Sequence, residues 1–184
     1  MMKNIGLIIG AIILLASCTN VDTETIQEIE KWESKLDSAH QVYLNTDFDS
    51  INKMVWKVKE NEKAIKRLNS ADTIYSDMVK VLDDYKWIRK KVKNVEVKKL
   101  EYKTEFDELK LQLENLKLDV QNGVRTSEEN KQYLSNEVQS IKVLMTKFSK
   151  DHETFTEGMK RFGELNGKVQ VYVDQLKRDK GIIK

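Results

Sequence analysis

The stretch that decides the fold is residues 134–176, which read LSNEVQSIKVLMTKFSKDHETFTEGMKRFGELNGKVQVYVDQL. Positions spaced alternately four and three residues apart are apolar, with two exceptions at His152 and Asn166. An apolar repeat of this spacing forms one stripe along a helix and does not fit a strand, whose side chains alternate with a period of two. The stretch therefore predicts one long helix with a single buried face. The apolar members of this stripe are Leu134, Val138, Ile141, Met145, Phe148, Phe155, Met159, Phe162, Val169, Val173 and Leu176.

The same spacing runs upstream through residues 74–120, where Lys99 is the one polar member of the stripe. Between the two stripes, Gly123 can end a helix, and Thr126 with Glu129 three residues later has the pattern of a capping box. We therefore expect helices over residues 71–121 and 127–178, folded back on each other as an antiparallel hairpin. Counted from this turn, the expected register pairs Tyr85 with Phe162.

Two shorter amphipathic stretches precede the hairpin and predict helices over residues 22–44 and 47–69. Their connections are only a few residues long and contain Asn, Asp and Ser, which favour helix N-caps. Short connections favour antiparallel neighbours, so we expect both short helices to pack on the nearer half of the hairpin, residues 71–95 and 153–178. The predicted fold is all-α: an elongated helical hairpin, or coiled coil, with a four-helix bundle at its base and a two-helix arm.

The composition agrees with long helices, because the 184 residues include no proline. Three of the seven glycines, Gly158, Gly163 and Gly167, nevertheless fall inside the last predicted helix. Each costs up to about 1 kcal/mol relative to alanine there. Close approach by the short helices is the favoured explanation, and a hinge is the alternative.

The N-terminus has the features of a targeting segment. Residues 1–17 contain one positive charge at Lys3 and an apolar run of about twelve residues, short of the ~20 that span a bilayer. The run ends in Leu15-Ala16-Ser17-Cys18, and Cys18 is the single cysteine of the chain. This tetrapeptide resembles the lipobox of bacterial lipoproteins. An ordinary secretory signal with an incidental cysteine is the alternative.

The resemblance covers residues 1–18 and implies removal of residues 1–17, with a diacylglycerol and an N-acyl lipid on Cys18. Residues 18–21 are then an acylated cysteine and a short tether. Two or three acyl chains anchor firmly, since each buried methylene contributes about 0.8 kcal/mol. The resemblance implies a lipid-anchored protein of the cell envelope, in the outer membrane if the host has one, because Thr19 is not the aspartate associated with inner-membrane retention.

The composition and motifs give little support to an enzyme. One cysteine and two histidines leave few metal ligands, and the chain contains no phosphate-binding glycine loop, nucleophile elbow, HExxH or CxxC motif. A formal net charge of +2 offers no general attraction for nucleic acid. We therefore expect no catalytic residues, no metal and no cofactor besides the lipid, and neither a nucleic-acid partner nor an evident small-molecule substrate.

The polar members of the two stripes are the remaining candidates in the core. Asn166 is read as a device that fixes the register of the helices, a common use of a buried asparagine. His152 is read as a partly solvated core residue, with a metal or proton role as the alternative. Lys99 can lay its methylenes on the core and send its ammonium group to water.

Leu111, Leu118 and Val143 fall on the outward side of the predicted arm. They are either scattered surface residues, which are normal, or the site where a protein partner or a second copy docks. The basic tail, residues 179–184, is expected beside the lipid anchor, with the turn at 121–127 pointing away from the membrane.

These observations predict a structural or interaction protein that works by shape and contact, as a spacer, scaffold or adhesion-type arm. The alternative is an envelope lipoprotein that binds a small hydrophobic ligand between the base helices, near Trp32, Trp56 and Trp87.

Overall fold

The computed structural model describes residues 22–69 and 76–183. Every regular element in these two ranges is a helix, which confirms the all-α prediction. The predicted signal peptide and the tether of residues 18–21, with Cys18, lie outside the described residues. The helices are α1 (Thr23–Leu44), α2 (Phe48–Leu68), α3 (Ser76–Lys91), α4 (Val95–Gln121) and α5 (Ser127–Asp179).

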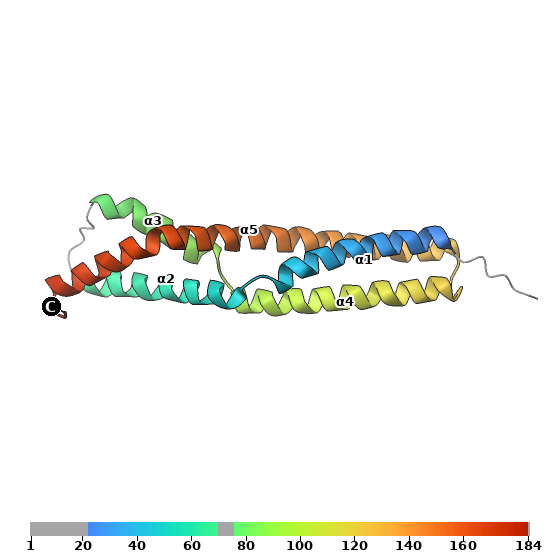
Figure 1. Ribbon diagram of the computed structural model, residues 1–184, viewed down its shortest axis with the longest axis horizontal. Helices are drawn as coiled ribbons and strands as arrows, with labels where there is room; N and C mark the ends of the chain where they lie inside the picture. The colour runs from blue at the N-terminus through green and yellow to red at the C-terminus, as the bar shows by residue number, and fades with distance from the viewer. Residues whose placement is uncertain (1–21, 70–75, 184) are drawn as a thin grey trace, which may run out of the picture.

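The helices form a rod in which α5 runs the whole length (Figure 1). Its 53 residues span about 80 Å at 1.5 Å per residue. One half of the rod contains α1, α4 and the first part of α5, and the other half contains α2, α3 and the rest of α5. The rod is therefore three helices thick along its length.

The hairpin register predicted from the sequence is confirmed where rings meet: the centroids of Tyr85 and Phe162 lie 6.3 Å apart. Along the other side, α1 and α2 run parallel to α5. The Ser127 hydroxyl donates to Asp22 at 2.6 Å near the start of α1, and the rings of Phe48 and Phe155 lie 6.1 Å apart at the start of α2. The difference in residue number between the two partners is nearly the same in both pairs. α1 and α2 therefore keep one register against α5 across their connection.

The predicted four-helix base is wrong, because α1 and α2 do not fold back on each other. α1 contacts α4 and α5, whereas α2 contacts α3, α5 and the start of α4. The connection at residues 45–47 is a kink that keeps the chain direction. Tyr43 and Phe48 on its two sides are both buried, with ring centroids 5.4 Å apart, so the core continues across the kink. Spreading the two helices along the hairpin also covers the apolar stripe of its arm, which the predicted arrangement would have left exposed.

The predicted helix over residues 71–121 is also interrupted, at residues 92–94 between α3 and α4. Asn94 adopts a left-handed conformation with φ of 56°, which asparagine tolerates better than most residues. Val92 and Val95 flank the break and are both buried. The break therefore turns the backbone without removing its apolar side chains from the core.

Helix caps fall where the sequence places them. Asp47 accepts a hydrogen bond from the Ser50 amide at 2.9 Å and starts α2. At the start of α5, Thr126 and Glu129 form the expected capping box. Gly123 has a positive φ of 62° in the turn after α4, as expected for a helix-ending glycine.

The three glycines of α5 have different surroundings. A Cβ on Gly158 would lie 2.6 Å from Cγ2 of Val92 and 3.5 Å from Cε of Met54. Close approach therefore explains this glycine, but the tight neighbour is Val92 at the break between α3 and α4, whereas the short helix α2 makes only an ordinary contact through Met54. A Cβ on Gly163 or Gly167 would meet nothing within 4 Å, so the same explanation is wrong for these two positions.

The two ends of the described chain lie at opposite ends of the rod (Figure 1). The start of α1 is beside the turn between α4 and α5, as the hydrogen bond between Asp22 and Ser127 shows. The expectation that the basic tail lies beside the anchor, with this turn far away, is therefore wrong. It assumed three chain reversals, whereas the kink between α1 and α2 removes one and leaves two. None of the helices in residues 22–69 and 76–183 has the length and hydropathy needed to span a bilayer.

Candidate functional site

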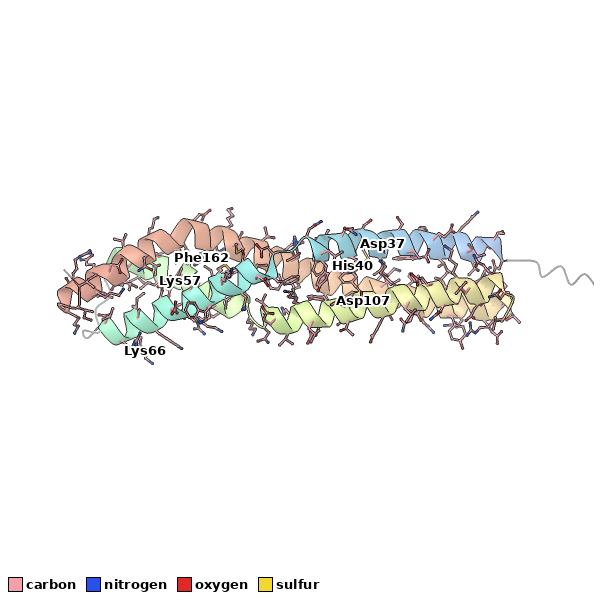
Figure 2. All side chains as sticks on the ribbon, turned by 60° about the horizontal axis from the view of Figure 1, so that its bottom comes forward. Asp37, His40, Lys57, Lys66, Asp107 and Phe162 are labelled. Carbon is pink, nitrogen blue, oxygen red and sulfur yellow. The ribbon has the colours of Figure 1, made fainter. Side chains whose placement is uncertain are left out.

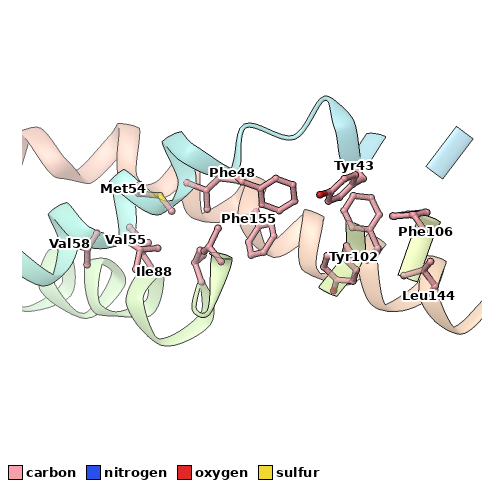
Figure 3. Close-up of a cluster of buried hydrophobic side chains, with 14 of the residues drawn as sticks. Tyr43, Phe48, Met54, Val55, Val58, Ile88, Tyr102, Phe106, Leu144 and Phe155 are labelled. Atoms are coloured by element: carbon pink, nitrogen blue, oxygen red, sulfur yellow. The ribbon is translucent and has the colours of Figure 1, made fainter. Parts of the chain in front are cut away.

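Aromatic side chains fill the middle of the rod, where α1 ends and α2 begins (Figure 3). Phe148 of α5 lies at the centre of this group and is 3% exposed. Its ring centroid is 5.2 Å from Tyr102, 5.7 Å from Phe106 and 6.1 Å from Tyr43, with edge-to-face geometry in each pair. Such pairs contribute about 0.5–1.5 kcal/mol each beyond their burial. The central aromatic cluster comprises His40, Tyr43, Phe48, Tyr102, Phe106, Phe148, His152 and Phe155.

The hydroxyl groups of the cluster are directed to fixed acceptors. Tyr102 donates to Oδ2 of Asp151 at 2.5 Å, and the same carboxylate pairs with Lys98 at 2.7 Å. Burial, and then the hydrogen bond to Asp151, raise the pKa of Tyr102 well above its ordinary value. Tyr43 donates to the backbone carbonyl of Lys99 at 3.0 Å. These bonds hold the rings in place. Burial also raises the pKa of Tyr43, so both phenols stay protonated.

The polar residues singled out from the stripes near this cluster do not form a reactive group. His152 is half-buried and lies 5.8 Å from Phe148, ring to ring. His40 stacks on Phe106, and burial lowers the pKa of its imidazole. The Lys99 ammonium pairs with Asp49 of α2 at 3.0 Å, a hydrogen bond that raises the pKa of Lys99. Within the described residues, no three His, Cys, Asp or Glu side chains are placed to hold a metal ion.

Asn166 belongs to a buried polar layer made by one residue from each of three helices. Asn61 of α2 donates to the Tyr85 hydroxyl of α3 at 2.9 Å and to Oδ1 of Asn166 at 3.2 Å. Tyr85 in turn donates to Oδ1 of Asn166 at 2.8 Å. Tyr85 is fully buried, and burial raises its pKa to about 12. This polar layer joins all three helices at one level of the rod.

Replacing Asn166 with leucine is expected to lower the free energy of unfolding by about 1–3 kcal/mol, because the buried Tyr85 hydroxyl loses its acceptor. The triple replacement Asn61→Leu, Tyr85→Phe and Asn166→Leu is expected to recover this loss, since no polar group is then left without a partner. Urea unfolding followed by circular dichroism measures both. A triple variant less stable than the single one would show that the layer stabilises the fold outright and does not serve to fix the register.

Two exposed helix faces carry opposite charge. The exposed residues of α2, here called the α2 face, include five cations and one acid; those of α4, the α4 face, include five acids and one lysine. The five α2 cations form no ion pair with any described residue. The α2 face is Asp49, Asn52, Lys53, Trp56, Lys59, Lys63, Lys66 and Arg67. The α4 face is Glu96, Val97, Leu100, Glu101, Lys103, Thr104, Asp107, Glu108, Leu111, Gln112, Glu114, Asn115, Leu118 and Gln121.

The three apolar residues expected to face outward are exposed, but they do not form one patch. Leu111 and Leu118 lie two turns apart on the α4 face. Val143 of α5 lines a shallow groove of about 400 Å³ together with Glu108 of α4, and neither leucine lines that groove.

The three tryptophans likewise do not share a site. Trp32 of α1 is nearly buried, and the ammonium groups of Lys35 and Lys142 lie over its ring. Trp87 of α3 lies under the guanidinium of Arg161. Trp56 of α2 is 61% exposed.

Searches against protein-family models, curated proteins and solved structures find no match to this chain. The candidate functional features are therefore those of the chain itself: the rod, its two oppositely charged faces, and the sequence at Cys18.

Proposed function

We propose that this chain is a lipid-anchored protein of the bacterial cell envelope, and that its helical rod acts by shape and contact. The observation that carries the proposal is the lipobox-like sequence ending at Cys18, only four residues before Asp22, which caps α1. A tether this short would hold the rod close to the membrane that contains the acyl chains.

The fold supports one orientation of the rod relative to the membrane. Asp22 lies beside Ser127, so the turn at residues 122–126 would be the membrane-proximal end. Hydrogen bonds from Ser127 and the Thr25 amide lower the pKa of Asp22, which favours the charged form that caps α1. The end formed by α2, α3 and the C-terminus would then reach about 80 Å outward, which suits a spacer, a scaffold or an interaction arm.

Replacing Cys18 with serine is expected to abolish lipid attachment and to release the chain from membranes, because serine offers no thiol for the thioether bond. Growth of expressing cells with radiolabelled palmitate, followed by membrane fractionation, measures both effects. Ser17→Ala is the matched control, since it keeps a small residue at that position, and it is expected to label and fractionate like the unaltered chain. An unlabelled Cys18→Ser chain that stays with the membrane fraction would contradict the anchor.

A further inference from the structure

α2 and α4 together form one edge of the rod, as both views show (Figures 1 and 2). Their N-termini meet near the middle, where the Lys99 ammonium pairs with Asp49 at 3.0 Å. From this point the two helices run in opposite directions. In Figure 2, Lys66 lies on the α2 half of the rod and Asp107 on the α4 half. The edge therefore has a basic half and an acidic half.

The charges on this edge have few partners within the chain. All five cations of the α2 face lack an ion pair with described residues, and so do Glu108 and Glu114 of the α4 face. By contrast, the lysines on the side of α4 that faces α1 are paired: Lys110 with Asp37 at 2.7 Å, and Lys117 with Glu33 at 3.0 Å. Both edge faces thus present charge that is available to another molecule.

We propose that two copies of this chain associate side by side and antiparallel, with the α2 face of each on the α4 face of the other. A two-fold axis near the Asp49–Lys99 pair generates this contact twice, as in any isologous dimer. Because both helices rise 1.5 Å per residue, equal distances from the axis oppose each other. Lys59 is ten residues beyond Asp49 and Glu108 nine beyond Lys99, so these two opposite charges lie at nearly the same level along the pair.

The same register brings further groups together. Lys63 lies fourteen residues beyond Asp49, at nearly the level of Glu114, which lies fifteen beyond Lys99. Trp56, seven residues beyond Asp49, falls between the levels of Leu100 and Leu111. Exposed tryptophans with large contact area are typical anchors of interfaces. The apolar residues of the α4 face thus gain a partner that the chain alone does not give them.

The charges select the antiparallel arrangement. In a parallel pair, α2 would face α2 and α4 would face α4, and five cations or five acids would oppose their own copies. Like charges placed against each other oppose association, whereas complementary faces speed association and fix the register. This association is a property of the folded rod. Between chains that carry the proposed lipid anchor, the antiparallel pair places the two anchored ends at opposite ends, so it joins rods on facing membranes or rods that lie along one membrane.

Sedimentation equilibrium of a chain beginning at Thr19 tests the proposal, because this chain keeps every residue that the structure describes. We expect a dimer whose dissociation constant rises between about 50 mM and about 500 mM salt, as for other charge-based contacts. The variant Lys59→Glu/Lys63→Glu is expected to raise the dissociation constant by about 100-fold, and Glu108→Lys/Glu114→Lys is expected to do the same. The quadruple variant restores opposite charges and is expected to return to within about tenfold of the original value.

The matched control is Lys150→Glu/Lys160→Glu, which makes the same change in net charge on exposed positions of α5 and is expected to leave the dimer intact. Circular dichroism confirms that each variant is folded. A chain that stays monomeric at low salt would overturn the proposal. So would a dimer whose dissociation constant does not change when the charges of the α2 face or of the α4 face are reversed. So would a monomer whose α2 face binds vesicles of phosphatidylglycerol, since the occupant would then be an anionic membrane.

Distances between spin labels distinguish an antiparallel pair from a parallel one. The chain from Thr19 contains no cysteine, so a single cysteine at Asn122 labels only the end of the rod beside the start of α1. Asn122 lies 23 residues beyond Lys99, so an antiparallel pair holds these labels about 70 Å apart, whereas a parallel pair brings them close together. A short distance between Asn122 labels would overturn the proposal, and a short distance between an Asn122 label on one copy and an Arg178 label on the other supports it.

Discussion

Replacing Phe148 with alanine is expected to lower the free energy of unfolding by about 3–5 kcal/mol, the range for a buried aromatic truncated in a core. Phe148 is 3% exposed and contacts rings from α1 and α4 as well as its own helix. Removing the ring leaves a cavity at the kink between α1 and α2. The end of α1 and the start of α2 both pack on the central aromatic cluster there. Urea unfolding followed by circular dichroism measures the loss.

Two controls separate burial from other effects of this change. Phe148→Leu keeps most of the volume and is expected to cost less than about 1.5 kcal/mol. Phe162→Ala removes a half-buried ring, stacked on Tyr85, and is expected to cost clearly less than Phe148→Ala. If Phe162→Ala proved the more damaging of the two alanine variants, the centre of the rod would not be its best-packed region.

Replacing Gly158 with leucine is expected to cost about 3 kcal/mol, because even the first added atom would overlap Cγ2 of Val92. Val92 is fully buried and β-branched, so its side chain has no alternative place to turn. The clash falls at the break between α3 and α4. We therefore expect early opening of α3, measurable as faster amide hydrogen exchange in that helix.

Gly163→Leu is the matched control for this clash. A Cβ at Gly163 meets nothing within 4 Å, and leucine is a better helix former than glycine by up to about 1 kcal/mol, so the variant is expected to gain stability. Adding Val92→Ala to Gly158→Leu is expected to recover part of the loss, giving a non-additive pair. Equal effects of leucine at Gly158 and Gly163 would contradict the close contact.

The sequence predicted the features that depend on local patterns. The 3.5-residue repeat identified the long hairpin, and the capping residues Thr126 and Glu129 located its turn. Because that turn is short, it also fixed the register, as the contact of Tyr85 with Phe162 confirms. Each of these predictions needed only residues close in sequence, or a count outward from one turn.

Local patterns could not predict whether α2 reverses the direction of α1 or continues it. A three-residue connection with a capping Asp47 fits a reversal and a kink equally well, and the choice depends on which arrangement buries more of the hairpin. The break at Asn94 was hidden for a related reason. Ile88, Val92, Val95 and Lys99 keep the four-three spacing through the break, so the apolar repeat carries no sign of it.

The polar layer was found only in part. Asn166 was identified because it interrupts an apolar stripe. Asn61 interrupts the stripe of α2 in the same way, between Val58 and Ile65, so this signal was present and could have suggested a pair. Tyr85 gave no such signal, since a tyrosine on a stripe is ordinary. The charged α2 face needed the exposure of each side chain, which depends on where α3 and α5 lie.

The two breaks in the rod have a mechanical consequence, because they lie at nearly the same level. α2 begins directly after the kink at residues 45–47 and α4 directly after the break at residues 92–94, and the Asp49–Lys99 pair joins these two N-terminal turns at 3.0 Å. Among the described helices, α5 is the one that passes this level without interruption. We therefore expect the rod to bend at this level first under a sideways load at its tip, against the resistance of α5 and of the central aromatic cluster.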